Sequence, residues 1–119
     1  MSLPIPGSPV RGSKTGKPIM ALLDLLGRTW ALGVIWQLRQ GPLSFSELQL
    51  SCENISPTLL TKRLKELQQT NLIGKNLQGY QLTDNGLALF NVISPLSQWA
   101  MLWQLSFDED KKTQGSLNE

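Results

Sequence analysis

The segment that most constrains the fold is residues 55–72, with the sequence ISPTLLTKRLKELQQTNL. Ser56 is a favourable helix N-cap, because its hydroxyl can accept a backbone N–H of the first turn, and Pro57 suits the first helical position. At about 100° per residue, leucines fall on one stripe and polar residues on the opposite side. The leucines are Leu59, Leu60, Leu64 and Leu67, and the polar residues are Thr58, Thr61, Lys62, Lys65 and Gln69. One side of this helix therefore packs and the other is exposed.

The exposed face carries hydroxyl, amide and ammonium groups but no carboxylate, and Glu66 lies off it. Such groups suit contacts with phosphates and base edges, so the segment is interpreted as a DNA recognition helix. An ordinary surface helix also exposes lysines, threonines and glutamines to solvent. The choice between the two interpretations depends on the neighbouring segments.

Both neighbouring segments favour DNA binding. Ser44 and Glu47 have capping-box spacing and predict a short helix, which the turn 52–55 joins to the recognition helix. Two short helices joined in this way form a helix-turn-helix. Downstream, residues 72–83 suggest two short strands around Gln78 and Gly79, where the glycine supplies the positive φ of a tight hairpin. That hairpin would be a wing.

Length and charge predict one compact domain. The chain has 119 residues, of which 40% are hydrophobic, and a net charge of only +2. Positive charge is concentrated in residues 57–75, which hold Lys62, Arg63, Lys65 and Lys75 against Glu66 alone. We expect a flexible basic arm over residues 1–17, the folded domain over 18–107 and a frayed tail over 108–119. The arm either reaches a neighbouring DNA groove or remains a solvated tail.

The chain contains one cysteine and no histidine, which excludes an internal disulfide and the common Cys/His zinc sites. Neither a catalytic constellation nor a Gly-rich phosphate loop is present, so we expect no enzyme activity and no cofactor. Cys52 is interpreted as a small, partly buried residue rather than a redox sensor, because nothing basic adjoins it. Prolines and glycines break up the N-terminal residues, which argues against a signal peptide and for a cytoplasmic protein.

Two further helices are expected before the helix-turn-helix. Pro18 opens the first, which runs to Leu26 and ends at Gly27, and Thr29 caps the second, over residues 30–39. The second is apolar almost all round and so belongs in the core. Trp30 and Trp36 are interpreted as packing residues, with an aromatic ligand cage as the alternative.

The last helical region starts near residues 83–86 and runs to about Phe107, with Pro95 kinking or dividing it. This region carries more apolar surface than the core of a small helix-turn-helix domain can cover. Polar residues spread through it argue against a membrane span. The better account is that an identical helix from a partner chain covers the excess apolar surface. The resulting two-fold dimer would place two recognition helices about 34 Å apart.

The order of these parts resembles the HxlR-type branch of the winged-helix regulators, relatives of the MarR group. The matching residues are 26–30 (LGRTW), 41–48 (GPLSFSEL), 55–67 (ISPTLLTKRLKEL), 82–86 (LTDNG) and Trp99. The resemblance implies a mainly α fold with a small β-hairpin wing (α+β). It also implies a homodimeric transcription regulator, with the first and last helices forming the dimer. Two features depart from the pattern of the family. No cysteine precedes the first helix, and Lys75 is the only cation of a short wing.

We therefore predict a sequence-specific regulator of transcription that binds double-stranded DNA as a homodimer, with residues 56–70 in the major groove. The predicted DNA-binding residues are Ser56, Thr58, Thr61, Lys62, Arg63, Lys65 and Lys75, and the predicted dimer residues are Ile19, Leu22, Leu23, Leu96, Trp99 and Trp103. One alternative is a winged-helix protein-interaction module that does not hold DNA. Another adds a small apolar effector between the last helix and the tryptophan-rich second helix.

Overall fold

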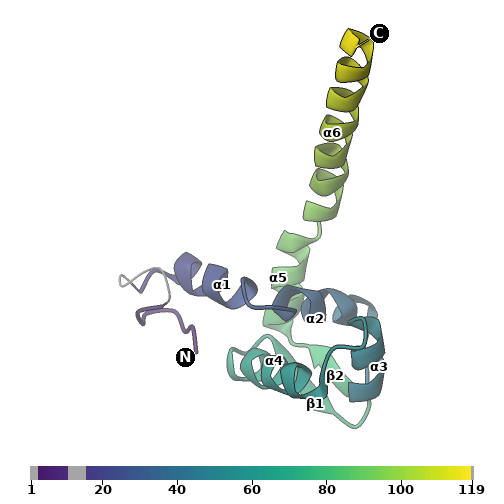
Figure 1. The fold of residues 1–119 in the computed structure, drawn as a ribbon. Coiled ribbons are helices and arrows are strands. Elements are labelled where there is room, and N and C mark those ends of the chain that lie inside the picture. Colours follow the sequence, from purple (N-terminus) through teal and green to yellow (C-terminus); the bar gives the residue numbers. More distant parts are fainter. Residues whose placement is uncertain (1–2, 11–15, 119) are drawn as a thin grey trace.

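The computed structural model describes residues 3–10 and 16–118, with side chains described as far as residue 110. In chain order the elements are α1 (Pro18–Leu26), α2 (Ala31–Gln37), the 3-10 turn η1 (Leu38–Gln40), α3 (Phe45–Ser51), α4 (Pro57–Gln69), β1 (Ile73–Asn76), β2 (Gly79–Leu82), α5 (Asp84–Ile93) and α6 (Leu96–Asn118). The chain is mainly α with one antiparallel hairpin (Figure 1). This is the winged helix-turn-helix arrangement expected from the sequence.

The core forms around α2, which contacts α1, α3, α4 and α5. Its Val34 and Ile35 are fully buried, as expected for a helix that is apolar almost all round. Leu60, Leu64 and Leu67 of α4 are also buried against this centre. The leucine stripe thus fixes which side of α4 faces inward and which side faces outward.

Local side-chain caps set where α3, α4 and α5 begin. Ser44 and Glu47 form the predicted capping box at the start of α3, with hydrogen bonds of 3.1 and 3.0 Å. The Ser56 hydroxyl accepts the Leu59 N–H at 3.1 Å and starts α4. These caps satisfy backbone N–H groups that have no partner within the helix.

The predicted start of α2 was wrong. Trp30 is the N-cap residue, with φ of +69°, and the helix begins without a side-chain cap from Thr29. Its α-helical part ends at Gln37 and continues as η1 rather than as α-helix to residue 39. Side-chain packing explains the difference, because Trp30 packs against the hydrophobic core and its indole also lies directly against Gly33.

The wing pairs Ile73 with Leu82 and Asn76 with Gly79 at its two ends. Gly79 has φ of +122°, as the hairpin requires, and a side chain there would meet the Leu43 carbonyl oxygen at 2.4 Å. That close approach arises because Leu43 pairs with Tyr80 through hydrogen bonds of 2.8 and 3.0 Å. The segment before α3 therefore covers the outer edge of β2 and ties the wing to the helix-turn-helix.

Pro95 lies between α5 and α6, so it divides the last helical region as expected. α6 projects away from the other elements (Figure 1). The expected helix end near Phe107 was wrong, since α6 continues to Asn118. Residues 96–113 contain neither proline nor glycine, so nothing in this stretch breaks the helix at Phe107. The division of the chain into arm, domain and tail stays a prediction.

Within the described residues, none of the helices alone is long and apolar enough to cross a membrane. α1 and α2 with η1 reach the required length and composition only as a pair, bent by 83°.

Candidate nucleic-acid interface

The outward side of α4 holds an exposed polar face in the structure. The side chains of this face come from successive turns of the helix and do not point into the core. They belong to Ser56, Thr58, Thr61, Lys62, Lys65 and Gln69. All of these residues are exposed, whereas Leu60, Leu64 and Leu67 are buried. The face presents hydroxyls, an amide and two ammonium groups without a carboxylate, which suits an anionic polymer.

The amino end of α4 can also bind an anion. Ser56 uses an oxygen lone pair to accept the Leu59 N–H, so its own O–H remains available as a donor. The helix dipole places partial positive charge at this end. A phosphate that meets Ser56 would therefore lie at the most favourable end of the helix.

The turn between α3 and α4 is held by backbone conformation and one amide side chain. Glu53 and Asn54 both have positive φ, 58° and 57°. The Gln49 amide donates to the Ile55 carbonyl at 3.1 Å, and the Asn54 N–H donates to the Gln49 carbonyl at 2.9 Å. The sequence indicated a turn here but not the role of Gln49. These bonds fix α3 relative to α4.

Cys52 in the same turn is fully buried. Burial raises the pKa of its thiol above the ordinary value of 9.0, and the nearby Glu53 charge raises it further. A thiol in this state is a packing residue with little thiolate at neutral pH. The structure thus agrees with the interpretation of Cys52 as a small buried residue.

The wing offers little positive charge. Lys75 is exposed, and its Nζ lies 5.2 Å from the centroid of the Tyr80 ring. Leu77 at the tip of the hairpin is fully exposed. Asn76 accepts the Gln78 N–H through its side chain at 2.8 Å and so stabilises the turn. Lys75 lies on β1 and not on α4, so its positive charge is separate from that of Lys62 and Lys65.

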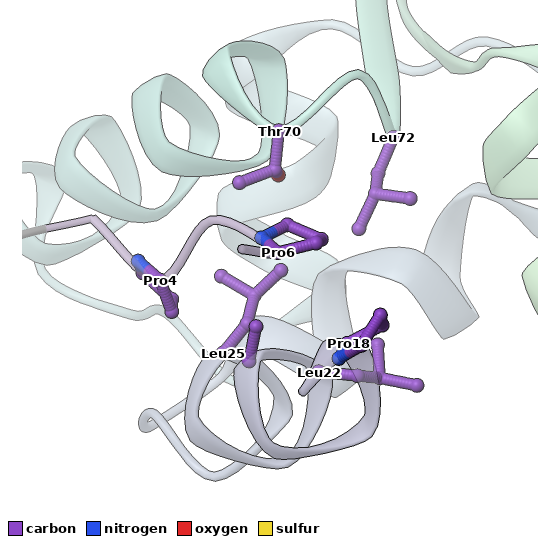
Figure 2. Close-up of a pocket in the computed structure, with 8 residues that line it drawn as sticks. Pro4, Pro6, Pro18, Leu22, Leu25, Thr70 and Leu72 are labelled. Atoms are coloured by element: carbon purple, nitrogen blue, oxygen red, sulfur yellow. The ribbon is translucent and has the colours of Figure 1, made fainter. Parts of the chain in front are cut away.

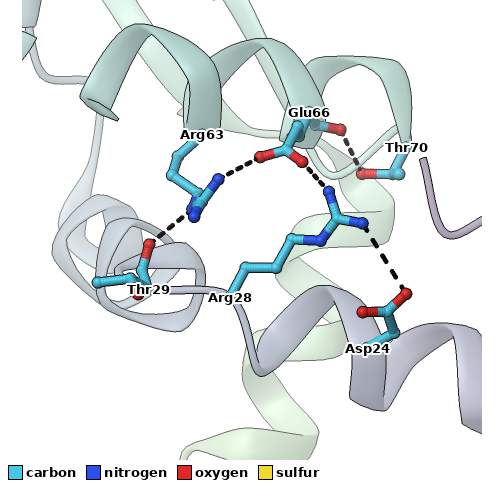
Figure 3. Close-up of polar contacts among 6 residues, drawn as sticks. All are labelled: Asp24, Arg28, Thr29, Arg63, Glu66 and Thr70. Carbon is cyan, nitrogen blue, oxygen red and sulfur yellow. Dashed lines mark hydrogen bonds and ion pairs between the residues drawn. The ribbon is translucent and has the colours of Figure 1, made fainter. Parts of the chain in front are cut away.

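Arg63 does not share the exposed face of α4. It is held inward by a group of four charged side chains, called here the charge cluster, which consists of Asp24, Arg28, Arg63 and Glu66 (Figure 3). The Arg63 guanidinium donates to the Thr29 carbonyl at 2.6 Å and to Glu66 Oε1 at 2.7 Å. Arg28 donates to Glu66 Oε2 and faces Asp24 at 3.8 Å. The i, i+3 spacing of Arg63 and Glu66 was visible in the sequence, but the role of Arg28 was not.

The predicted dimer residues lie on two helices. Ile19 and Leu23 of α1 are each 56% exposed, whereas Leu22 is partly covered. Leu96, Trp99 and Trp103 of α6 are 53 to 59% exposed. The rings of Trp99 and Trp103 stack at 5.8 Å, and Trp103 meets Phe107 edge-on at 5.4 Å. An apolar stripe of large side chains thus runs along α6, and no element among the described residues covers it.

The other two tryptophans pack inside the domain. Trp30 packs against the core, and Trp36 meets Phe90 of α5 edge-on at 5.4 Å. An apolar hollow of about 130 Å³ lies elsewhere, between residues 4–6, α1 and the end of α4 (Figure 2). It is lined by Pro4, Pro6, Pro18, Ala21, Leu22, Leu25, Thr70 and Leu72. Over residues 3–10 and 16–118, no three His, Cys, Asp or Glu side chains come together as a metal site would require.

A helix-turn-helix with a polar outward helix and a following two-stranded wing defines the winged-helix class of DNA-binding proteins. A family model described as HxlR-like helix-turn-helix matches residues 25–107. The chain therefore belongs to the HxlR family of helix-turn-helix transcriptional regulators, and the resemblance found in the sequence is confirmed.

Individual relatives agree with this assignment. YvaP of Bacillus subtilis, an uncharacterized HTH-type transcriptional regulator, is 32% identical over 88 residues, covering 68% of this chain and 82% of YvaP. YodB of the same organism, an HTH-type transcriptional regulator, is 34% identical over 84 residues, covering 65% of this chain and 75% of YodB. The crystal structure of quinone-bound YodB superposes with a TM-score of 0.66, covering 71% of this chain and 96% of YodB at 33% identity. A possible HxlR family factor from Thermoplasma volcanium gives the same TM-score at 28% identity, covering 74% and 85%.

Proposed function

We propose that this protein is a sequence-specific regulator of transcription that binds double-stranded DNA as a homodimer, with α4 in the major groove. The observation that carries the proposal is the outward face of α4, where every polar side chain predicted from the sequence except Arg63 is exposed. A cytoplasmic location is part of the proposal, because DNA is the proposed ligand. Family membership supports DNA binding, and the geometry of the face supports the groove assignment.

The residues of this face would have distinct roles. Thr58, Thr61 and Lys62 lie toward the first half of α4, where a recognition helix reaches base edges. Lys65, Ser56 and Lys75 would contact phosphates. Arg63 was also predicted to bind DNA, but its guanidinium donates to the Thr29 carbonyl and to Glu66, so the proposal includes no DNA contact for it.

The exposed apolar stripe on α6 supports the homodimer. Side chains as large as Trp99 and Trp103 that stay more than half exposed are typical of a surface that a partner covers. α1 exposes Ile19 and Leu23 in the same way, so both terminal helices would contribute. A two-fold arrangement would place two α4 helices about one turn of DNA apart, roughly 34 Å.

A small apolar effector is a second element of the proposal. YodB has been crystallised with a quinone bound, which supports an organic effector for a relative of this fold. The expected location was between the last helix and α2. The apolar hollow between α1 and the end of α4 is a further location that such a molecule could occupy. Quenching of tryptophan fluorescence by candidate compounds would test binding.

The competing function is a protein-interaction module that keeps the fold without holding DNA. It is favoured by the low positive charge of the wing, where Lys75 is the only cation between Ile73 and Leu82, and by the net charge of only +2. Against it stands the lack of a carboxylate on the exposed face of α4.

Selection from random double-stranded DNA at two salt concentrations tests the proposal. We expect an enriched site with two-fold symmetry, and an affinity that falls by orders of magnitude from low to moderate salt if the dimer neutralises about six to eight phosphates. Enrichment of an asymmetric site would contradict the dimer. Absence of binding even at low salt would overturn the DNA-binding proposal in favour of the interaction module.

A further inference from the structure

The charge cluster lies beside the proposed DNA contacts without sharing their face. Arg63 directly follows Lys62, and Glu66 directly follows Lys65. Each step along a helix turns the side chain by about 100°, so the lysines point outward while the arginine and the glutamate turn inward. The four side chains of the cluster are only 2 to 11% exposed. Each inward residue is thus anchored next to an outward lysine.

The cluster joins three segments that are separate in the sequence. Asp24 belongs to α1, Arg28 follows α1, and Glu66 belongs to α4. The Glu66 carboxylate accepts Arg28 on one oxygen and Arg63 on the other, and Arg63 also holds the Thr29 carbonyl (Figure 3). Two arginines and two carboxylates balance their formal charges. The recognition helix is therefore tied to the end of α1 through directional bonds.

Stability alone explains the cluster poorly. Leu60, Leu64 and Leu67 already bury the inward side of α4. A buried ion cluster is weak evidence for stabilisation, because desolvation of the charges offsets their attraction. Apolar packing is non-directional, whereas a guanidinium that bonds two acceptors fixes an orientation. The leucines set which side of α4 faces inward, and the bonds of Arg28 and Arg63 add a directional restraint on the rotation of α4 about its own axis.

We infer that Glu66, Arg28 and Arg63 are positioning residues, which set the rotation of α4 against the end of α1 so that Lys62 and Lys65 meet the DNA. The inference rests on the proposed DNA-binding function and assigns these residues no contact with DNA. Because α1 also carries Ile19 and Leu23 of the proposed dimer surface, one chain of bonds links the dimer surface to the DNA-binding face.

Replacement of Glu66 by Gln tests this role with little change in shape. The matched control is Glu53→Gln, which changes the net charge equally at an exposed position outside the cluster. Affinity is measured for the selected DNA site and for unrelated DNA, well below the thermal midpoint of each variant. We expect Glu66→Gln to bind the selected site about tenfold more weakly than Glu53→Gln, with an unchanged salt dependence. Asp24→Asn provides a milder variant if Glu66→Gln fails to fold.

Replacement of Arg63 by Lys separates positioning from direct contact. Lysine keeps the charge but lacks the rigid planar fork whose Nε reaches Thr29 and whose Nη1 reaches Glu66, so positioning predicts that Arg63→Lys loses affinity as Glu66→Gln does. A direct phosphate contact predicts instead that Arg63→Lys binds like the wild type and that Arg63→Ala lowers the salt slope by about one.

Each outcome is decisive. Equal affinities of Glu66→Gln and Glu53→Gln for the selected site would overturn the inference, as would wild-type affinity of Arg63→Lys. A wild-type protein that binds no DNA even at low salt would overturn the proposed function itself, and the inference with it. The wild-type measurement therefore distinguishes the two failures.

Discussion

The indole of Trp30 lies so close to Gly33 that a Cβ added there would be 2.6 Å from a ring carbon of the tryptophan. Trp30 also has φ of +69°, which is costly for a bulky residue. We expect Gly33→Ala to lower the free energy of unfolding by about 1 to 3 kcal/mol, because overpacking outweighs the gain of about 1 kcal/mol in helix propensity. Urea unfolding monitored by circular dichroism measures the change.

Gly74→Ala is the matched control for this prediction. A Cβ at Gly74 would meet only the Thr83 methyl at 3.9 Å, an ordinary contact. Its stability should equal or exceed that of the wild type. If both variants unfold at the same urea concentration, the close contact of Trp30 with Gly33 does not limit the residue at position 33.

Lys65 and Thr61 should affect DNA binding in different ways. Both are exposed on α4, but an ammonium group suits a phosphate and a threonine suits a base edge. We expect Lys65→Ala to weaken binding to all sequences and to reduce the salt slope by about one, whereas Thr61→Ala changes the preference at one base position. Selection followed by sequencing, and titrations at several salt concentrations, measure the two effects.

The same behaviour in both variants would contradict this division of roles. Gln68→Ala is a suitable control, because Gln68 is exposed on α4 but is not among the predicted contacts. It should leave both affinity and base preference close to those of the wild type.

Features that depend on neighbouring residues could be predicted from the sequence. The caps of α3 and α4 use partners three residues away, and the leucine stripe follows the helical period, so their patterns are visible in the chain. The contact of Arg28 with Glu66 could not be predicted, because the two residues are 38 positions apart. The bond from Arg63 to the Thr29 carbonyl spans 34 positions and was equally unpredictable, and it holds Arg63 away from the exposed face on which its lysine neighbours lie.

The left-handed backbone of Trp30 was unpredictable for a similar reason. Thr29 is a good capping residue by its chemistry, yet the packing of Trp30 against the hydrophobic core decides where α2 begins. Tertiary contacts thus override a local preference at this position. The outward face of α4 was predictable because no long-range contact competes for its side chains.

Glu47 should make stability depend on pH. Hydrogen bonds from Ser44, first from its backbone N–H and then from its hydroxyl, hold the pKa of the exposed Glu47 carboxyl below its ordinary value of 4.5. A lowered folded-state pKa contributes stability above pH 4.5, and this stability is lost as the pH falls through the folded-state pKa. Glu47→Gln keeps an acceptor for the Ser44 N–H without titrating.

The difference in unfolding free energy between the wild type and Glu47→Gln isolates this effect from the other carboxylates. It should favour the wild type most at neutral pH and shrink as the pH falls below 4.5. A difference that stays constant from neutral to acid pH would show that ionisation of Glu47 does not stabilise the capping box.

Cys52 should react slowly with thiol reagents. It is fully buried, and its pKa is raised by burial and by Glu53, so little thiolate exists at neutral pH. Alkylation by iodoacetamide, followed by mass spectrometry, should be slow in buffer and fast in denaturant. Stability from this thiol is present below pH 9.0 and is lost as the pH rises through the raised folded-state pKa, because the unfolded chain ionises first. Equal alkylation rates with and without denaturant would contradict its burial in solution.

Trp99 and Trp103 should control self-association. They stack on each other and remain more than half exposed, so replacing both by Ala removes apolar area at a proposed interface and little packing within the chain. We expect Trp99→Ala with Trp103→Ala to raise the dimer dissociation constant by at least about 30-fold, as loss of an aromatic anchor worth about 2 kcal/mol would do. Sedimentation equilibrium over a range of protein concentrations measures it.

Leu50→Ala is the control for this last change, because Leu50 is 70% exposed on α3, away from both terminal helices. It should associate like the wild type, and circular dichroism should show helix in all three proteins. In the wild type, tryptophan emission should shift to shorter wavelength as dimers form, since Trp99 and Trp103 leave water on association. If the double variant and the wild type dissociate at the same concentration, the exposed stripe of α6 is not the dimer interface, and the two recognition helices must be paired through another surface.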